Sequence, residues 1–258
     1  MSADFISEKL RNVLEPNGFE IHPFKIGWYN EKVKPVFHLS YPQDTLSFCV
    51  LSTPSMFDKA FLPFVERLKT QSEIENRDPI DSCVAEQLQK AKEALQPDHE
   101  VNIIQDFEVH PVTRRPKLLV QTAGHVSGAA FYYKRDSITN DPWDEKKKVY
   151  GVSIHPKYGG WFAFRGAIII KDTFCSDLQQ TAPPKTLSTD QEIVDLLEKF
   201  NFHWKENTFR DVVPVQEKYS AEQICYWNTA PSKRFALLGI KDKLKSMSSF
   251  QDPHENIF

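Results

Sequence analysis

Three arginines lie in apolar or aromatic surroundings, where a charged side chain needs a partner. Arg165 stands within WFAFRGAIII, Arg210 follows the aromatic run NFHWKENTF, and Arg234 begins the apolar face of the last expected helix. An unpaired buried charge is costly, so each guanidinium should meet either a structural carboxylate or an anionic ligand held by its planar fork of donors. A structural role is the more common outcome for any one of them. Together they suggest an anion pocket, although the sequence does not show that they converge.

His125 is a further candidate for ligand contact. Its neighbours are small, and small neighbours leave room for the imidazole to face a ligand: Ala123, Gly124, Ser127 and Gly128. The alternative, which is the more common, is a histidine hydrogen-bonded inside a tight helix packing.

The stretch from Arg114 to Gly166 concentrates residue types that suit a ligand cavity. It holds six of the nine glycines of the chain and many of its aromatic residues. Glycine lets backbone approach a ligand closely, and aromatic rings offer flat apolar faces. We therefore expect this stretch to form the wall of a cavity for a large, flat, partly polar ligand. Tyr132 and Tyr133 would point to opposite faces of a strand, so at most one of them faces that cavity.

Composition limits the other classes of function. The 258 residues carry a net charge of −3, which indicates no long-range attraction to nucleic acid or to an anionic membrane. No apolar stretch reaches membrane-spanning length. The first residues resemble neither a signal peptide nor a presequence, so a cytoplasmic location and four reduced cysteines are expected. No zinc-ligand spacing, Walker A loop, G-x-G-x-x-G motif or G-x-S-x-G motif is present.

The periodicity predicts an α+β fold with an antiparallel sheet flanked by helices. In the first half we expect helices and strands at the following positions: a helix over 5–14, a strand within 19–29, a strand over 45–52, a helix from Ser55 to about Leu68, a helix capped by Asp78 and running to about Leu95, and a strand over 101–109.

The second half is predicted to continue the same alternation. We expect these features: a helix opened by Arg115–Pro116 and closed by Gly128, a strand over 129–134, a hairpin of 149–154 with 161–170 around Gly159–Gly160, a loop over 171–187, and helices beginning near Thr189, Ser220 and Pro231. One domain over residues 1–240, followed by a polar tail over 241–258, is the simplest organisation.

The longer motifs of the chain resemble those of a known family, the cytosolic vitamin B12 processing proteins of the CblC type (methylmalonic aciduria and homocystinuria, type C). The resemblance extends from about residue 4 to residue 240. It is carried by these segments: GFEIHPFKIGWYN, LSTPSMFDKAFLPF, DFEVHPVTRRPKLLVQTAGHVSGAAFYY, GVSIHPKYGGWFAFRG, FNFHWKENTFRD and RFALLGI.

The resemblance implies a modified flavin-dependent nitroreductase fold with an added β-rich portion. It also implies binding of cyanocobalamin and alkylcobalamins with the lower base detached. The upper axial ligand would be removed either by reductive decyanation with reduced FMN or FAD, or by alkyl transfer to glutathione. The product would pass to the CblD-type trafficking protein, and methionine synthase is a further possible partner. The choice of flavin, the role of NADPH as electron source, and the choice between a monomer and a ligand-linked homodimer stay open.

Carried over by motif, the resemblance assigns roles to individual residues. Arg165, Arg210 and Arg234 match the family's glutathione pocket, where they would fix the carboxylates and favour the thiolate. His125 would lie close to the cofactor, and cobalt stays in the corrin, so no metal ligand is expected from the protein. The cobalamin contacts would be Asp106, Leu118, Leu119, Val120, Gln121, Tyr132, Tyr133, Lys134, Ser153 and Phe164.

Two departures from the family pattern bear on the site. Asn207 stands where a second tryptophan is expected, and Ser153 stands where a cysteine is expected. Two other functions compete with the enzyme: a carrier that detaches the lower base without turnover, and a flavin reductase of nitroreductase type that does not bind B12. The three arginines favour the enzyme, because a pure carrier needs no glutathione site.

Overall fold

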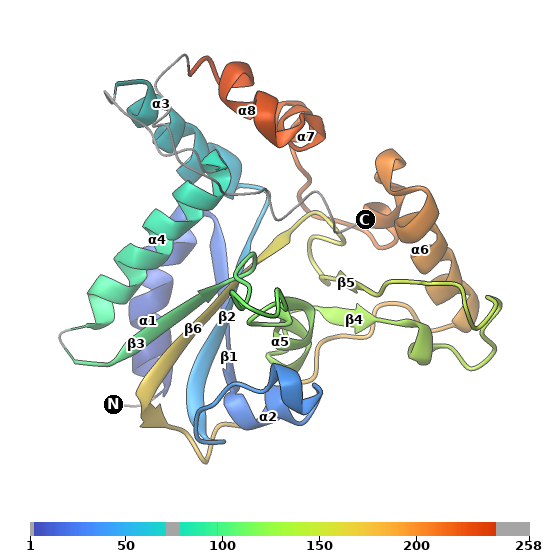
Figure 1. Ribbon diagram of the computed structural model, residues 1–258, viewed down its shortest axis with the longest axis horizontal. Helices are drawn as coiled ribbons and strands as arrows, with labels where there is room; N and C mark the ends of the chain where they lie inside the picture. The colour runs from blue at the N-terminus through green and yellow to red at the C-terminus, as the bar shows by residue number, and fades with distance from the viewer. Residues whose placement is uncertain (1–2, 71–77, 97, 241–258) are drawn as a thin grey trace.

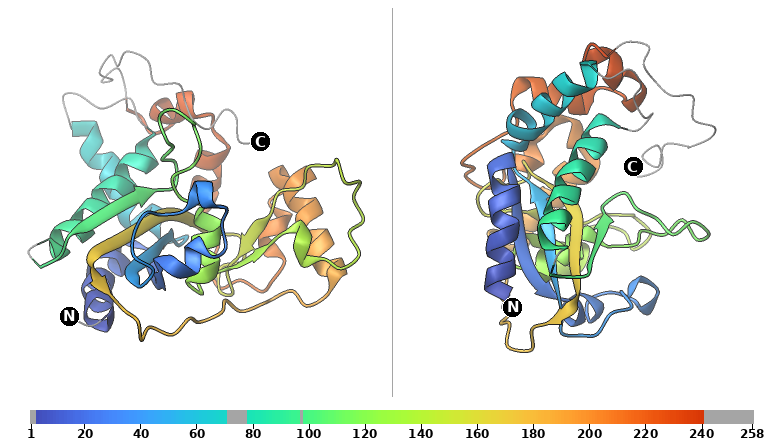
Figure 2. Two further views of the ribbon diagram at one scale, coloured as in Figure 1. Left: turned by 60° about the horizontal axis from the view of Figure 1, so that its bottom comes forward. Right: turned by 90° about the vertical axis from the view of Figure 1, so that its left-hand side faces the viewer.

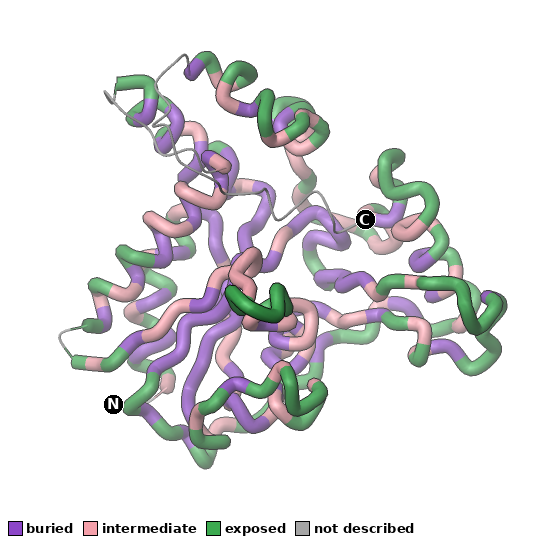
Figure 3. Tube along the Cα trace, viewed as in Figure 1, coloured by how far each residue is buried: buried purple, intermediate pink, exposed green. Residues whose placement is uncertain are grey.

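A four-stranded antiparallel sheet is the centre of the molecule (Figure 1). The computed structural model describes residues 3–70, 78–96 and 98–240, so the tail expected over 241–258 lies outside the described residues. The strand order is β1-β2-β6-β3. The strands are β1 (Phe19–Lys25), β2 (Thr45–Ser52), β6 (Ala163–Phe174) and β3 (Val101–Gln105). Strand β2 coincides with the expected apolar run and is buried along its whole length (Figure 3).

Helices cover both faces of this sheet, which explains why its two central strands are largely buried, β2 along its whole length and β6 from Phe164 to Ile170. The first face packs against α1 (Ala3–Leu14), α3 (Leu62–Thr70) and α4 (Pro79–Leu95). The second face packs against α2 (Ile26–Asn30) and α5 (Val120–Val126). Figure 2 shows the same layers from two further directions.

A smaller β-rich portion lies beside the main sheet (Figure 1). It consists of the antiparallel strands β4 (Phe131–Tyr133) and β5 (Val152–Ile154), with α6 (Asp190–Phe202) packed on a separate apolar cluster. Two short helices, α7 (Ala221–Asn228) and α8 (Pro231–Leu237), complete the described chain near α3. The ring centroid of Tyr226 in α7 lies 4.9 Å from that of Phe61, so α7 packs against the core of the first face.

The expected helix starts are confirmed where a side chain caps the backbone. Asp78 accepts a hydrogen bond from the N–H of Ile80, and Thr189 forms a capping box with Glu192. Ser220 likewise caps α7. Ser55 does not cap a helix, because the chain enters α3 through a turn of π-helix over Phe57–Phe61.

The predicted hairpin of 149–154 with 161–170 is wrong. Strand β5 pairs with β4, whereas β6 enters the main sheet between β2 and β3. The turn itself was correctly located, since His155 and Gly159 form an isolated bridge, but the two segments then diverge. Strand β6 also extends to Phe174, into the segment expected to be a loop.

Two further boundaries differ from expectation. Strand β3 ends at Gln105 rather than near Val109, because Val109 instead forms an isolated bridge with Pro116. Pro116 therefore belongs to an extended turn and does not open a helix. The helix that follows, α5, begins only at Val120 and stops before Gly128, whose φ of +80° suits glycine.

Candidate functional site

Arg165 occupies a β-bulge in β6. Val50 of β2 pairs with Gly166, but its neighbour Leu51 pairs with Phe164, so Arg165 is an extra residue without a partner on β2. A bulge shifts the alternation of side chains and re-aims the extra one. As a result Phe164 and Ala167, three residues apart, both join the second-face core. Gly166 has a φ of +127°, and a Cβ there would lie 2.0 Å from the carbonyl oxygen of Ile104, so only glycine fits.

The re-aimed Arg165 side chain points toward the first face. Its Nε donates to Ser52 Oγ at 2.9 Å, and its guanidinium lies over the ring of Trp227 with Cζ 5.5 Å from the centroid. The residue is only 4% exposed. Among the described residues no carboxylate forms an ion pair with it. Within the described part of the chain, Arg165 is therefore a buried cation without a contacting counter-ion.

Arg234 reaches the same indole ring from α8. Its Cζ lies 5.4 Å from the centroid of Trp227 and 4.9 Å from that of Tyr226. Unlike Arg165 it has a carboxylate partner, since its Nη1 donates to Asp78 Oδ2. Its Nε donates to the carbonyl of Thr229 at 3.1 Å. Two of the three candidate arginines thus meet at Trp227, and one of them is already paired.

A second carboxyl group near these arginines is only partly ionised at neutral pH. Burial, followed by the nearby charges of Asp78 and Asp106, raises the pKa of Asp81 to about 7, and the positive charges of Arg165 and Arg234 oppose that rise. Asp81 therefore supplies less than a full negative charge, while Asp78 and Asp106 add negative charge to the same neighbourhood.

Arg210 lies in a different set of contacts. Its guanidinium lies over Trp161, Phe209 and Tyr219, with Cζ 4.8–5.3 Å from the ring centroids. Its Nη1 donates to the carbonyl of Gly160. Its Nε donates to Asn207 Oδ1 at 3.1 Å. Asn207 adopts a left-handed conformation with φ of +59°, which asparagine tolerates better than a bulky residue does.

Arg210 lines a pocket of about 200 Å³ together with three of the predicted cobalamin contacts, Gln121, Ser153 and Phe164. Ser153 Oγ donates to Gln121 Oε1 at 3.0 Å, and Gln121 Nε2 donates to the carbonyl of Gly151 at 3.3 Å. These bonds fix the amide of Gln121 between α5 and β5. The pocket wall therefore combines aromatic rings with an oriented amide and one cation.

Helix α5 comes unusually close to β6 at this pocket. A Cβ on Gly124 would lie 2.1 Å from the ring of Phe164, so glycine is what allows the contact. At the start of the helix, Leu118 is buried and the N–H of Leu119 donates to the hydroxyl of Tyr29 at 3.0 Å. Val120 is the first helical residue. Asp106 lies beyond the end of β3, where its N–H donates to the carbonyl of Arg165.

His125 is held as a neutral imidazole with a defined tautomer. Its Nδ1 accepts from the N–H of Tyr132 at 3.2 Å, so the proton of the neutral ring is on Nε2. Burial, together with the charges of Lys134 and Lys32, lowers its pKa. Its Nε2–H can donate to a ligand.

The two adjacent tyrosines separate as the strand alternation predicts. Tyr133 is fully buried, and its hydroxyl accepts from the N–H of Leu187 at 2.7 Å, which makes it a structural residue. Tyr132 is half-buried on the other side of β4, and the exposed Lys134 lies 5.8 Å from its ring centroid. Of the two, only Tyr132 remains a candidate for ligand contact.

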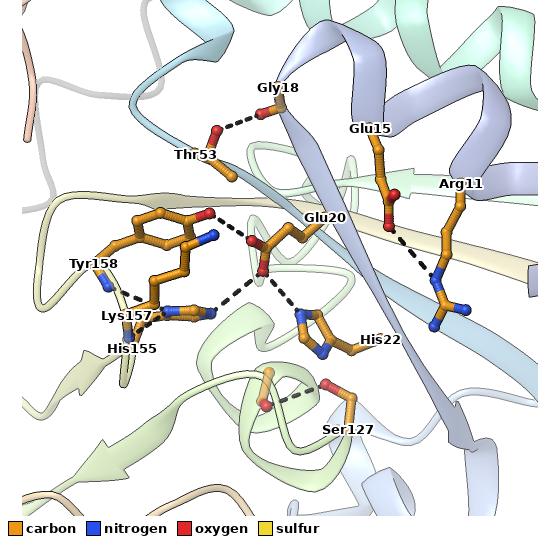
Figure 4. Close-up of polar contacts among 11 residues, drawn as sticks. Arg11, Glu15, Gly18, Glu20, His22, Thr53, Ser127, His155, Lys157 and Tyr158 are labelled. Carbon is orange, nitrogen blue, oxygen red and sulfur yellow. Dashed lines mark hydrogen bonds and ion pairs between the residues drawn. The ribbon is translucent and has the colours of Figure 1, made fainter. Parts of the chain in front are cut away.

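A polar cluster that the sequence analysis missed lies on the edge strand β1 (Figure 4). Glu20 Oε2 lies 3.4 Å from both His22 Nε2 and His155 Nε2, and Glu20 Oε1 accepts from the hydroxyl of Tyr158 at 2.6 Å. A pocket of about 520 Å³ adjoins it. Burial would raise the pKa of Glu20, but the close contacts with His155 and His22 and the hydrogen bond from Tyr158 outweigh it and hold that pKa far below its usual range.

The potential ligand atoms of Glu20, His22 and His155 lie within 4.8 Å of one another, which is close enough for them to hold a metal ion together. The tautomer of His155 argues against one. Its Nδ1 accepts from the N–H groups of Lys157 (3.1 Å) and Tyr158 (3.3 Å), so Nε2 carries the proton and has no lone pair for a metal. The cluster instead connects the 155–160 loop to β1, through the contacts of Tyr158 and His155 with Glu20.

No helix among the described residues is long and apolar enough to cross a membrane.

Comparison with known proteins gives consistent matches over most of the chain. Residues 18–238 match the methylmalonic aciduria and homocystinuria type C family. A Gallus gallus protein named cyanocobalamin reductase / alkylcobalamin dealkylase is 53% identical over 237 residues, which cover 91% of this chain and 96% of that one. The Homo sapiens protein of the same name is 46% identical over 244 residues, covering 95% and 84%. A crystal structure of a C. elegans B12-trafficking protein, CblC, superposes with a TM-score of 0.81 at 33% identity, covering 92% of this chain and 95% of that one.

Proposed function

Because the chain belongs to the methylmalonic aciduria and homocystinuria type C family, we propose that it binds cobalamins and removes their upper axial ligand. The relatives are named for two such reactions, reduction of cyanocobalamin and dealkylation of alkylcobalamins. Three further proposals are carried over from the sequence: a nitroreductase-like form of the α+β fold, a single domain over residues 1–240, and a cytoplasmic location.

Cobalamin is proposed to bind where α5, β4, β5 and the start of β6 meet. The oriented amide of Gln121 and the hydroxyl of Ser153 offer hydrogen bonds to the corrin's amide side chains. Phe164 and Tyr132 offer apolar faces to its hydrocarbon. His125 Nε2–H supplies a neutral donor beside them. The lower base is proposed to leave cobalt on binding, which favours lower coordination and makes loss of the upper ligand easier.

Glutathione is proposed as the acceptor of the alkyl group, and the observation that carries this proposal is the buried Arg165. A guanidinium that is 4% exposed and lacks a contacting carboxylate is a costly feature unless an anion binds it. Glutathione has two carboxylates, and a bidentate pair with Arg165 would fix one of them. Arg234 adds positive potential beside it, and Arg210 adds a cation at the cobalamin pocket.

The proposed dealkylation is a nucleophilic substitution. The glutathione thiolate forms a bond to the cobalt-bound carbon, and the electron pair of the cobalt–carbon bond stays on the metal. The products are the thioether and cob(I)alamin. Nearby guanidinium groups favour the thiolate over the thiol, and holding both reactants together supplies most of the acceleration.

Decyanation requires an electron donor, for which reduced FMN or FAD is proposed from the sequence resemblance alone; we assign no residue to it. Transfer of the product to a CblD-type protein and to methionine synthase is proposed on the same basis.

An anaerobic titration tests the proposal. Apo protein is mixed with methylcobalamin, the visible spectrum is recorded, and glutathione is then added. The expected results are a base-off shift on mixing, followed by cob(I)alamin and S-methylglutathione. A base-off shift without later change would instead identify a carrier. Absence of any shift, combined with tight flavin binding, would identify a flavin reductase.

Arg165→Gln separates binding from turnover in this assay. The substitution should remove glutathione-dependent dealkylation and leave the base-off shift of methylcobalamin in place. Undiminished turnover would show that Arg165 does not hold the co-substrate.

A further inference from the structure

The indole N–H of Trp227 has no hydrogen-bond acceptor among the described residues, although the atom is buried. An indole nitrogen can only donate. Leaving a buried donor unpaired costs about 1–3 kcal/mol, so such a group needs an explanation. Trp227 differs in this respect from Trp143 and Trp161, whose N–H groups donate to Glu198 and Asp211.

The surroundings of Trp227 indicate what kind of acceptor is missing. The guanidinium carbons of Arg165 and Arg234 lie 5.5 and 5.4 Å from its ring centroid, so two cations share this one ring. Among the described residues Arg165 has no contacting carboxylate, and its one side-chain hydrogen bond goes to Ser52 Oγ. A donor without an acceptor and a cation without a contacting carboxylate thus meet at the same ring, and a carboxylate would satisfy both.

We infer that Trp227 donates its N–H to the carboxylate that Arg165 binds, and so helps to select and orient the anionic co-substrate. The inference rests on the proposed function, because it takes glutathione as that anion. A neutral donor suits this position, since a third cation would add repulsion to the two already present. Arg234 has less capacity to contribute, because Nη1 and Nε already donate to Asp78 and Thr229.

The arrangement also implies a local movement. Arg165 is only 4% exposed and the Trp227 N–H is buried, so a carboxylate that contacts both requires the surrounding side chains or helices to move. Helices α7 and α8 are short, of eight and seven residues.

Trp227→Phe tests the inference, because phenylalanine keeps an aromatic face for the two guanidinium groups and removes only the donor and one ring. The loss of a hydrogen bond to a charged group predicts a rise of about tenfold in the glutathione Kd and KM, with kcat and the base-off shift unchanged. Trp143→Phe is the matched control, because it removes an N–H that donates to protein, and it should leave the glutathione Kd unchanged.

Spectroscopy gives a readout that a purely structural tryptophan would not move. The chain has five tryptophans, so ¹⁵N-tryptophan labelling gives five indole signals. The signal missing from Trp227→Phe should shift downfield when glutathione is added to the wild type. It should not shift with the glutathione diester, whose carboxylates are blocked.

The outcomes separate this inference from the proposed function. If the wild type binds glutathione but Trp227→Phe binds it equally well and the indole signal stays in place, Trp227 has no role in recognition and the glutathione proposal survives. If the wild type does not bind glutathione, both are overturned.

Discussion

Arg165 donates its Nε hydrogen to Ser52 Oγ at 2.9 Å, across the point where β6 carries one residue more than β2. The bond connects the central cation of the proposed glutathione site to the neighbouring strand. The guanidinium carbon of Arg165 lies 5.5 Å from the ring centroid of Trp227, the ring that Arg234 also approaches.

Ser52→Ala should therefore loosen Arg165 without unfolding the sheet. A hydrogen bond of this kind is worth about 1 kcal/mol, so the glutathione KM should rise about fivefold while cobalamin binding is retained. Steady-state kinetics of methylcobalamin dealkylation measures the change. Ser47→Ala is the control on the same strand, because Ser47 Oγ is buried without a partner and contributes no bond to lose. Equal kinetics for the two variants would contradict a role for the Ser52 hydroxyl.

Gly124→Ala should destabilise the protein and weaken cobalamin binding. The new Cβ would meet the Phe164 ring at 2.1 Å, and such overpacking typically costs about 1–3 kcal/mol. Thermal unfolding and the methylcobalamin spectrum measure the two effects. The double variant Gly124→Ala/Phe164→Leu should recover part of the lost stability, because the smaller side chain makes room for the methyl group. Additive losses would mean that the two residues do not clash.

Glu20→Gln should destabilise the protein more at pH 7 than at pH 3. The pKa of Glu20 is depressed in the folded state, so its ionised form stabilises the fold above the ordinary glutamate pKa, and that contribution is lost as the pH falls below about 4. Loss of a hydrogen-bonded charge predicts a difference of about 1–3 kcal/mol at pH 7. Urea unfolding of both proteins at pH 7 and pH 3 checks the prediction, and a pH-independent difference would contradict it.

Asp81→Asn should have the opposite pH dependence. The raised pKa of Asp81 means that its protonated form favours folding, so this contribution is present below the ordinary aspartate pKa and is lost as the pH rises toward 7. The asparagine variant should thus gain stability relative to the wild type between pH 4 and pH 8. The expected gain is on the order of 1–2 kcal/mol, since the side chain keeps some contact with solvent. Urea unfolding across this range measures it, and parallel profiles would refute the assignment.

Local signals in the sequence predicted local structure well. The buried run Thr45–Ser52 became β2, and the Asp78–Pro79 pair began α4. The alternation of Tyr132 and Tyr133 correctly predicted that the two side chains separate, but it did not predict which of them is buried. Each of these features is determined by interactions between residues that are close together in the sequence.

Pairings between distant residues could not be predicted in the same way. Asp78 and Arg234 are 156 residues apart, and Glu20 and Tyr158 are 138 apart, so no spacing indicates either bond. The hairpin prediction failed for the same reason: Gly159–Gly160 does form a tight turn, but the partner of β6 is chosen by the main sheet. The positions of Trp227 and Asp81 beside Arg165 likewise follow from packing of α7 and α4, which composition does not reveal.

Because β6 carries one extra residue, the number of residues in this segment matters independently of their chemical types. Phe164 and Arg165 follow one alternation and Ala167 to Ile170 follow another, so the two halves of the strand are out of phase by one position. Deleting Ala163, which supplies no functional group to the site, would restore one phase throughout. Every functional group of the site would still be encoded, yet the guanidinium and the aromatic ring would exchange sides of the sheet. In this segment, substitutions should be tolerated more readily than any change in length.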